Sequence, residues 1–206
     1  MASSALTALI TGGTSGIGRA TANKLAQLGI HVLVVGRGAE RGKKTVDEIR
    51  AAGGKADFIA SDLRDAASAG EVAKKAIELG NGSVDILINN AGIYPFGPTH
   101  EMTEEQFDRV FSLNGKAPYF LVAELAPLMA KRGKGAIVNL STMAAEYGSP
   151  VPLPAGARGG WPPSRQARHF PVLCADVRDE TSDLRSNPRR ACRGANRSPA
   201  RRHAQP

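Results

Sequence analysis

The sequence contains little cysteine, few aromatic residues and no long run of apolar residues. Its two cysteines, Cys174 and Cys192, lack the spacing of a metal site or a redox pair. No apolar run approaches the roughly 18 residues that a membrane span needs. The N-terminus also lacks the basic region and the apolar core of a signal peptide. We therefore expect no metal site and no membrane contact, and we expect a cytoplasmic protein.

Lysine, isoleucine, methionine and tyrosine are absent from residues 151–206, where the composition changes. This segment has 11 arginines, 4 acidic residues and 8 of the 13 prolines, so it holds nearly all of the net charge of +8. Residues 1–150 are almost balanced, with 16 basic and 15 acidic residues. Apolar residues in the segment keep neither a helical nor a strand period, except for a strand-like run at residues 169–174. We therefore predict a folded domain at residues 1–150 and an irregular, poorly ordered Arg/Pro-rich tail at residues 151–206.

An arginine-rich tail is also found in proteins that bind nucleic acid. Here the tail contains only one tryptophan and one phenylalanine, Trp161 and Phe170, and it has no helical stripe of positive charge. Solvated disorder is the simpler interpretation of this composition, so we do not expect nucleic acid as a partner.

Apolar and amphipathic segments alternate along residues 1–150. Five short apolar runs have the length and composition of buried strands: residues 5–10, 30–35, 56–60, 84–88 and 136–140. Helical spacing of apolar residues falls between them, at residues 16–28, 39–52, 65–79 and 103–131. This alternation is typical of βαβ units with a parallel sheet. The longest predicted helix contains Pro118, which has no N–H for the carbonyl of Asn114, so we expect a kink with a bound water there.

The turn between the first predicted strand and the first predicted helix is rich in glycine. Residues 11–18 read Thr-Gly-Gly-Thr-Ser-Gly-Ile-Gly, which places glycines with Gly-x3-Gly-x-Gly spacing at Gly12, Gly16 and Gly18. Such a turn brings backbone N–H groups and the positive end of a helix dipole together, and this combination binds phosphate. Gly12 permits the tight turn, whereas Gly16 and Gly18 let a pyrophosphate and the neighbouring strand approach without a Cβ between them.

Together with later motifs, this turn resembles the short-chain dehydrogenase/reductase family over residues 5 to about 150. The later motifs are Asp62, Asn89-Asn90-Ala91-Gly92, Asn114 and the Ser141-Thr142 pair, in the order that the family has them. The resemblance implies an α/β protein with a doubly wound parallel-sheet Rossmann fold, of which about five strands are present and the last strands are missing. It also implies an oxidoreductase that transfers a hydride between a nicotinamide cofactor and a ketone or secondary alcohol.

The resemblance assigns each motif to a part of the cofactor. The pyrophosphate would be held by five residues of the glycine-rich turn: Gly12, Ser15, Gly16, Ile17 and Gly18. Asp62 and Leu63 would face the adenine, with the carboxylate accepting from the exocyclic amine; the alternative for Asp62 is an N-cap of the following helix. Asn89, Ala91 and Gly92 would line the ribose and connect the sheet to the long helix, although an ordinary turn after a strand explains part of the same pattern.

Arg37 indicates the type of cofactor. An acidic residue at the end of the second strand accepts from the ribose 2′-hydroxyl of NAD and repels a 2′-phosphate. Gly36 and Arg37 occupy that place here, and a guanidinium suits a phosphate dianion. The sequence therefore favours NADP(H) over NAD(H), the alternative being an arginine that is simply solvated at a strand end.

For catalysis the family uses an asparagine, a serine, a tyrosine and a lysine together. The tyrosine is the acid/base, and the lysine lowers its pKa. Asn114 matches the family asparagine. Its carbonyl, which Pro118 leaves unpaired, would bind the water that joins a proton relay in these enzymes. Thr142 matches the family serine, with Ser141 as the neighbouring candidate; the alternative for these hydroxyls is capping of the strand end.

The Tyr-x3-Lys pair of the family is missing. It should begin at Pro154 or Ala155, but no tyrosine follows Tyr147 and no lysine follows Lys134. The Arg/Pro/Ala/Gly-rich remainder resembles GC-rich coding sequence read in a shifted frame, and real divergence is the alternative. Two functions therefore stay open: an NADP(H)-dependent oxidoreductase acting on a small carbonyl or alcohol, and a non-catalytic NAD(P)-binding remnant or regulatory module. Family members are homo-oligomers, and the missing strands leave the assembly of this chain open.

Overall fold

The structure of the 206-residue chain is a computed structural model that describes residues 6–95, 98–141 and 175–176. The predicted tail at residues 151–206 lies outside the described residues, apart from residues 175–176. The predicted strand-like run at residues 169–174 also lies outside them.

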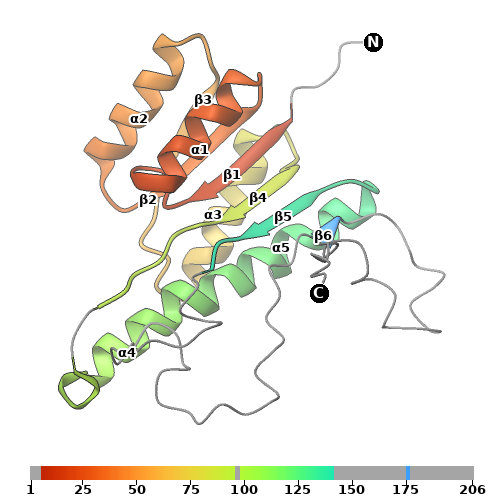
Figure 1. Ribbon diagram of the computed structural model, residues 1–206. Helices are drawn as coiled ribbons and strands as arrows, with labels where there is room; N and C mark the ends of the chain where they lie inside the picture. The colour runs from red at the N-terminus through yellow and green to blue at the C-terminus, as the bar shows by residue number, and fades with distance from the viewer. Residues whose placement is uncertain (1–5, 96–97, 142–174, 177–206) are drawn as a thin grey trace, which may run out of the picture.

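The described residues form a doubly wound α/β sheet, as the sequence predicted (Figure 1). The strands are β1 (Thr7–Thr11), β2 (His31–Gly36), β3 (Ala56–Ala60), β4 (Ile86–Asn89), β5 (Ala136–Asn139) and β6 (Ala175–Asp176). The helices are α1 (Gly16–Gln27), α2 (Ala39–Ala51), α3 (Ala66–Leu79), α4 (Glu104–Phe111) and α5 (Ala117–Lys131), with a 3-10 turn η1 (Thr99–Glu101) and a π-helical turn η2 (Ser112–Lys116).

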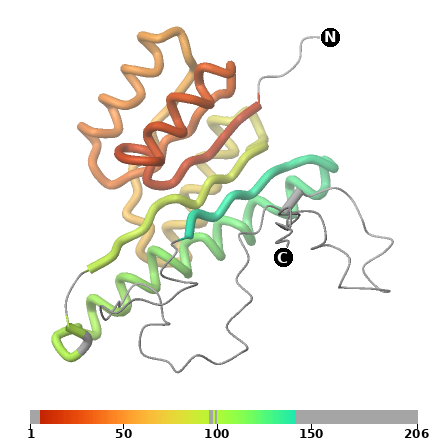
Figure 2. Tube along the Cα trace, viewed as in Figure 1, coloured from red at the N-terminus to blue at the C-terminus, as the bar shows by residue number. Residues whose placement is uncertain are grey.

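The strand order is β3-β2-β1-β4-β5-β6, and the first five strands are parallel. Figure 2 shows that β4 and β5 run side by side although a long helical segment separates them in the chain. The sixth strand was not predicted: β6 is antiparallel to β5 and pairs with it only at Ala136 and Ile137. The reversal of strand order at β1 and β4 creates a crevice at their carboxyl ends, where ligands bind in this class of fold.

Helices cover both faces of the sheet, because alternate residues of each strand point to opposite faces. On one face, Leu9 and Leu33 pack against buried residues of α3 and α5. On the other face, Ile10 and Val34 pack against buried residues of α1 and α2. Strands that are apolar on both faces explain why the sequence shows continuous apolar runs instead of a strict alternation.

The predicted long helix at residues 103–131 is divided in the structure. Thr103 and Gln106 form a capping box at the start of α4. The π-helical turn η2 then precedes α5, and Pro118 lies in the first turn of α5, where a proline is tolerated. The kink predicted from Pro118 is thus a widened turn that contains Asn114 itself, and such turns are frequent at functional sites.

The apolar side predicted for this long helix is only partly buried. Leu121 and Leu125 are buried, whereas Phe107 and Phe111 are more than 40% exposed and stack on each other, with ring centroids 4.4 Å apart. The π-helical turn η2 interrupts the regular α-helical period. The buried apolar side of α5 therefore does not continue along α4.

Helix α1 also differs from the pattern that predicted it. Ile17 and Leu28, two of the apolar residues with helical spacing, are 67% and 65% exposed. The buried face of α1 consists instead of Gly18, Ala22 and Ala26. A Cβ on Gly18 would overlap the Asn90 side chain and the carbonyl of Gly12, so small residues allow α1 to lie close to the sheet.

Within the described ranges, no helix has the length and apolar character needed to cross a lipid bilayer. The same residues contain no cluster of three or more potential metal ligands.

Candidate functional site

A cavity of about 180 Å³ lies at the carboxyl ends of the parallel strands, at the point where the strand order reverses. It brings together residues from the turn after β1, the ends of β2 and β3, the turn after β4, and helices α2 and α4. Its lining residues are Gly12, Thr14, Ser15, Val35, Gly36, Arg37, Arg41, Ser61, Asp62, Leu63, Ala91, Gly92, Ile93, Arg109 and Leu113. Seven of the predicted site residues are therefore in one place: Gly12, Ser15, Arg37, Asp62, Leu63, Ala91 and Gly92.

The glycine-rich turn is fastened to the turn after β4 by a network of hydrogen bonds. The hydroxyl of Thr11 accepts from the backbone N–H groups of Asn90 and Ala91, both at 3.0 Å. The Asn90 side-chain amide donates to the carbonyls of Thr11 and Gly12, at 2.9 and 3.2 Å. Gly12 has a φ of +66°, and a Cβ there would lie 2.9 Å from Cα of Ala91. A side chain at position 12 would therefore be strained and would push the two turns apart.

The N-terminus of α1 has no side-chain cap. Ser15 is the N-cap residue, but its hydroxyl makes no capping hydrogen bond and the first turn has no acidic residue. By contrast, α3 and α4 both begin with capping boxes. Gly16 has a φ of +51°, and a Cβ there would meet no atom within 4 Å. No side chain caps the first N–H groups of α1, so these groups can receive an anion.

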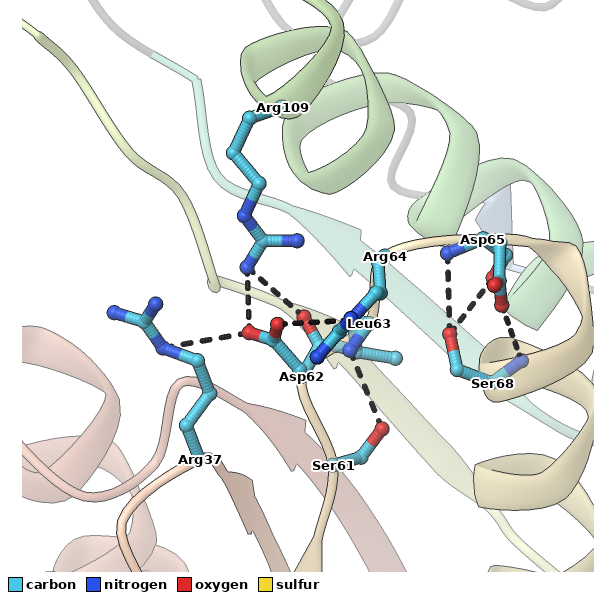
Figure 3. A network of polar contacts seen from close by, with 8 residues as sticks. All are labelled: Arg37, Ser61, Asp62, Leu63, Arg64, Asp65, Ser68 and Arg109. Atoms are coloured by element: carbon cyan, nitrogen blue, oxygen red, sulfur yellow. Dashed lines mark hydrogen bonds and ion pairs between the residues drawn. The ribbon is translucent and has the colours of Figure 1, made fainter. Parts of the chain in front are cut away.

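Asp62, which follows β3, is surrounded by three arginines from different parts of the chain (Figure 3). Arg109 Nη2 lies 2.6 Å from Asp62 Oδ1, Arg37 Nε lies 3.5 Å from the same oxygen, and Arg64 Nε lies 3.2 Å from Oδ2. The next residue, Leu63, has a φ of +48°, and its N–H donates to the Ser61 hydroxyl at 3.3 Å. The end of β3 is therefore held in one conformation that presents the Asp62 carboxylate to the cavity.

The N-cap alternative for Asp62 is wrong, because Asp65 caps α3. The Asp65 carboxylate accepts from the Ser68 N–H at 2.8 Å, and the Ser68 hydroxyl in turn accepts from the Asp65 N–H. The hydrogen bond from the Ser68 backbone is the main cause that lowers the pKa of Asp65 below its usual 3.8. The Asp62 carboxylate therefore caps no helix; it pairs with the three arginines and lines the cavity.

Two arginines lie beside the end of β2, and the sequence pattern indicated only Arg37. Arg37 is 61% exposed, and Arg41 comes from the first turn of α2 and lies over Gly38, whose Cβ would be 3.2 Å from Arg41 Nε. Both side chains line the cavity beside Gly36. Arg41 could have been found from its position four residues after Arg37, which places it at the start of a predicted helix.

The Asn114 side chain makes two hydrogen bonds to the backbone of Ile93. Its Oδ1 accepts from the Ile93 N–H at 3.0 Å, and its Nδ2 donates to the Ile93 carbonyl at 2.9 Å. This pairing joins η2 to the chain that follows the Asn-Asn-Ala-Gly turn. Asn114 thus connects the helical segment to the chain that follows β4, and it does not itself line the cavity.

Asn89 does not line the cavity. It is 4% exposed, and its Nδ2 donates to Asn139 Oδ1 at 2.8 Å, which joins the ends of β4 and β5. Ser141 lies two residues beyond the end of β5 and is exposed, whereas Thr142 lies outside the described residues. The predicted catalytic group is therefore described only for Asn114 and Ser141, and neither lines the cavity.

Comparison with known proteins assigns the class of this fold. A model of the short chain dehydrogenase family matches residues 6–154. The chain therefore belongs to the short-chain dehydrogenase family, a family of NAD(P)-dependent oxidoreductases, which confirms the resemblance seen in the sequence.

Individual relatives agree with this assignment. An uncharacterized oxidoreductase of Thermotoga maritima is 42% identical over 142 residues, which are 69% of this chain and 55% of the relative. The 2,3-dihydro-2,3-dihydroxybenzoate dehydrogenase of Bacillus subtilis is 34% identical over 138 residues, or 67% of this chain and 52% of the enzyme. The chain spans about half the length of the curated relatives it matches.

Solved structures show the same similarity. A metagenomic short-chain oxidoreductase in complex with NADP superimposes with a TM-score of 0.66 at 38% identity, covering 69% of this chain and 64% of the other. A blue fluorescent protein from a metagenomic library, in complex with NADPH, gives a TM-score of 0.66 at 31% identity, with coverages of 73% and 62%.

Proposed function

We propose that this chain binds NADP(H) and serves the transfer of a hydride between that cofactor and a ketone or secondary alcohol. The observation that carries the proposal is the uncapped N-terminus of α1, which opens toward a cavity that also contains Arg37 and Asp62. The helix N-terminus, with Arg37 and Arg41, favours a phosphate. The Asp62 carboxylate favours a base that carries an amine.

The cavity residues fit the parts of a dinucleotide in order along the strand ends. Gly12, Ser15 and Gly16, with Ile17 and Gly18, would hold the pyrophosphate at the start of α1. Asp62 and Leu63 would face the adenine, with Asp62 Oδ2 as the acceptor, because Oδ1 already has two guanidinium partners. Ala91 and Gly92 would line the ribose, with Asn89 holding their turn in place from the sheet.

The preference for NADP(H) follows from what stands at the end of β2. A Cβ on Gly36 would lie 2.7 Å from Thr14 Cγ2, so an acidic side chain that would accept from a 2′-hydroxyl is sterically disfavoured. Arg37 and Arg41 instead supply two positive charges beside this space. A phosphate dianion gains from both charges, whereas a hydroxyl does not.

When bound, the nicotinamide ring supplies the hydride, and the chain must orient the substrate and handle the proton. Asn114 holds the segment after β4 through Ile93, so it acts by fixing the geometry of that segment. The hydroxyl of Ser141 or Thr142 would donate to the substrate oxygen. An aliphatic hydroxyl is a poor general acid, so proton transfer lacks the help that the family tyrosine and lysine give.

A second function, a non-catalytic NAD(P)-binding module, is favoured by the missing Tyr-x3-Lys pair. The two functions share the nucleotide site and differ only in turnover. Fluorescence titration with NADPH and with NADH tests the shared part: we expect tighter binding of NADPH. Equal binding, or tighter binding of NADH, would remove Arg37 from the site. Measurable ketone reduction by the same preparation would favour the enzyme, and binding without turnover would favour the module.

A further inference from the structure

Arg109 of α4 reaches the end of β3 and holds both the side chain and the backbone of Asp62, 47 residues away in the chain. Its Nη2 donates to Asp62 Oδ1 at 2.6 Å and to the Asp62 carbonyl at 3.1 Å (Figure 3). No residue type in the sequence pattern of α4 indicated this contact. One nitrogen atom thus fixes the direction of the carboxylate relative to its own peptide.

The three arginines around Asp62 are not equivalent. The side chains of Arg37 and Arg64 are 61% and 72% exposed, whereas that of Arg109 is 24% exposed and makes the shortest contact. Exposed ion pairs contribute little and are screened by salt, but a charge-assisted hydrogen bond in a partly buried place holds its geometry. Arg109 is therefore the partner that determines where the carboxylate points.

The contact to the carbonyl matters because it is made to the peptide that leads into Leu63. Leu63 has a φ of +48°, a conformation that a branched side chain adopts at an energetic cost unless its surroundings hold it. Arg109 is one of those surroundings, together with the Ser61 hydroxyl that accepts from the Leu63 N–H. Helix α4 is itself fixed at its start by the Thr103–Gln106 capping box.

We infer that Arg109 is a positioning residue that aims Asp62 Oδ2 at the purine and so sets the preference for an amino-purine over an oxo-purine cofactor. The inference rests on the proposed contact between Asp62 and the adenine. Arg109 and Arg37 occupy Oδ1, which leaves Oδ2 with Arg64 alone. An exocyclic amine can donate to Oδ2, whereas the carbonyl of a hypoxanthine would face it with an acceptor against an acceptor.

The experiment compares the binding of NADPH with that of its hypoxanthine analogue, both in reduced form and followed by fluorescence on the full chain. In the unchanged protein we expect NADPH to bind about tenfold more tightly than the analogue, the size of one hydrogen bond to a charged acceptor. Arg109→Met keeps an unbranched apolar stem and removes the guanidinium, and we expect it to lose most of this ratio. Arg50→Gln is the control, because it removes an exposed arginine that pairs with Asp57 and does not line the cavity, and the ratio should stay.

A structural role for Arg109 would lower the affinity for both nucleotides equally and leave their ratio unchanged, so the ratio separates positioning from stability. Arg109 Nη1 is buried with no hydrogen-bond partner among the described residues, so removing the guanidinium also removes an unpaired group, which favours folding of the variant. Arg109→Lys is the second variant, which keeps the charge on a shorter side chain. Its ratio of affinities should fall between that of the unchanged protein and that of Arg109→Met.

The outcomes distinguish this inference from the function on which it rests. If the unchanged protein binds NADPH and its hypoxanthine analogue equally tightly, the proposed contact between Asp62 and the adenine is wrong. The same conclusion follows if Asp62→Asn keeps the preference for NADPH. If Asp62→Asn abolishes the ratio but every folded Arg109 variant keeps it in full, the adenine contact stands and the positioning role of Arg109 is overturned.

Discussion

Thr14 and Gly36 are packed so closely that a Cβ on Gly36 would lie 2.7 Å from Thr14 Cγ2 and 3.2 Å from Thr14 Oγ1. Thr14 belongs to the glycine-rich turn and Gly36 ends β2, so this contact sets the distance between that turn and the strand end at which we propose the cofactor is selected. The glycine at position 36 is therefore required by Thr14 as well as by the proposed 2′-phosphate.

Gly36→Ala should destabilise the protein by about 1–3 kcal/mol, because the added methyl overlaps Thr14. Thr14→Ser removes the nearest atom, Cγ2, so the double variant Thr14→Ser/Gly36→Ala should recover part of this loss. Denaturant midpoints of the four proteins measure the coupling. Additive effects of the two changes would show that the two side chains do not meet.

Replacing Arg37 and Arg41 together by glutamine should remove the preference for NADPH over NADH, because each guanidinium contributes a charged contact to the phosphate. We expect the NADPH affinity to fall by about tenfold or more and the NADH affinity to change little. Arg50→Gln is the control, since Arg50 lies on α2 like Arg41 but pairs with Asp57 and does not line the cavity. A similar loss of NADPH affinity in the control would point to a general charge effect.

Asn114→Ala should destabilise the protein by about 1–3 kcal/mol, because it leaves the N–H and the carbonyl of Ile93 without their partner. Asn114→Asp keeps an acceptor for the N–H but faces the carbonyl with a carboxylate, so we expect it to be no better than alanine at neutral pH. Thermal unfolding followed by circular dichroism measures both. Unchanged stability in Asn114→Ala would mean that water replaces the amide without loss.

The stability that the Asp65 cap provides should depend on pH. The pKa of Asp65 is lowered below 3.8 in the folded state, mainly by the Ser68 N–H, so the contribution is complete well above pH 3.8 and disappears as the pH falls through the folded pKa. The difference in unfolding midpoint between the unchanged protein and Asp65→Asn should therefore shrink on acidification. A difference that is constant between pH 7 and pH 2.5 would exclude a charged cap.

Ketone reduction by this chain should be slower than in an intact relative by about 10²–10⁴-fold, the usual contribution of general acid–base catalysis. The reason is that no tyrosine follows Tyr147 and no lysine follows Lys134. Grafting a Tyr-x3-Lys helix and the remaining strands after Ala157 should restore turnover. If the chain as it stands works at ordinary family rates, Tyr147→Phe tests the nearest tyrosine, and full activity in that variant would overturn this account of the proton donor.

The parallel sheet could be predicted from the sequence, because its strands are short apolar runs that are buried on both faces. The glycine-rich turn could be predicted as well, since Gly12 adopts the positive φ of a tight turn and Gly18 allows the close approach that its position indicated. Both features depend on local sequence and backbone geometry, which a single chain reveals.

The surroundings of Asp62 could not be predicted, because Arg109 lies 47 residues away and only the packing of α4 brings it to the end of β3. For the same reason, the exposure of Ile17 was missed: the side of α1 that faces the sheet is chosen by the close approach of Gly18 to Asn90. The pairing of β6 with β5 depends on residues distant in sequence and has no local signal of its own.

The hydrogen bonds that Thr11 and Gly12 make with Asn90 and Ala91 order the glycine-rich turn when the chain folds. Four bonds hold this turn to the end of β4, and all of them form within the protein itself. The entropy of ordering the turn is therefore lost when the chain folds and not when a nucleotide arrives, which makes the site preorganised. Nucleotide affinity then depends on the integrity of the sheet, so a substitution in the interior of β4, far from any phosphate, would weaken binding by loosening the turn.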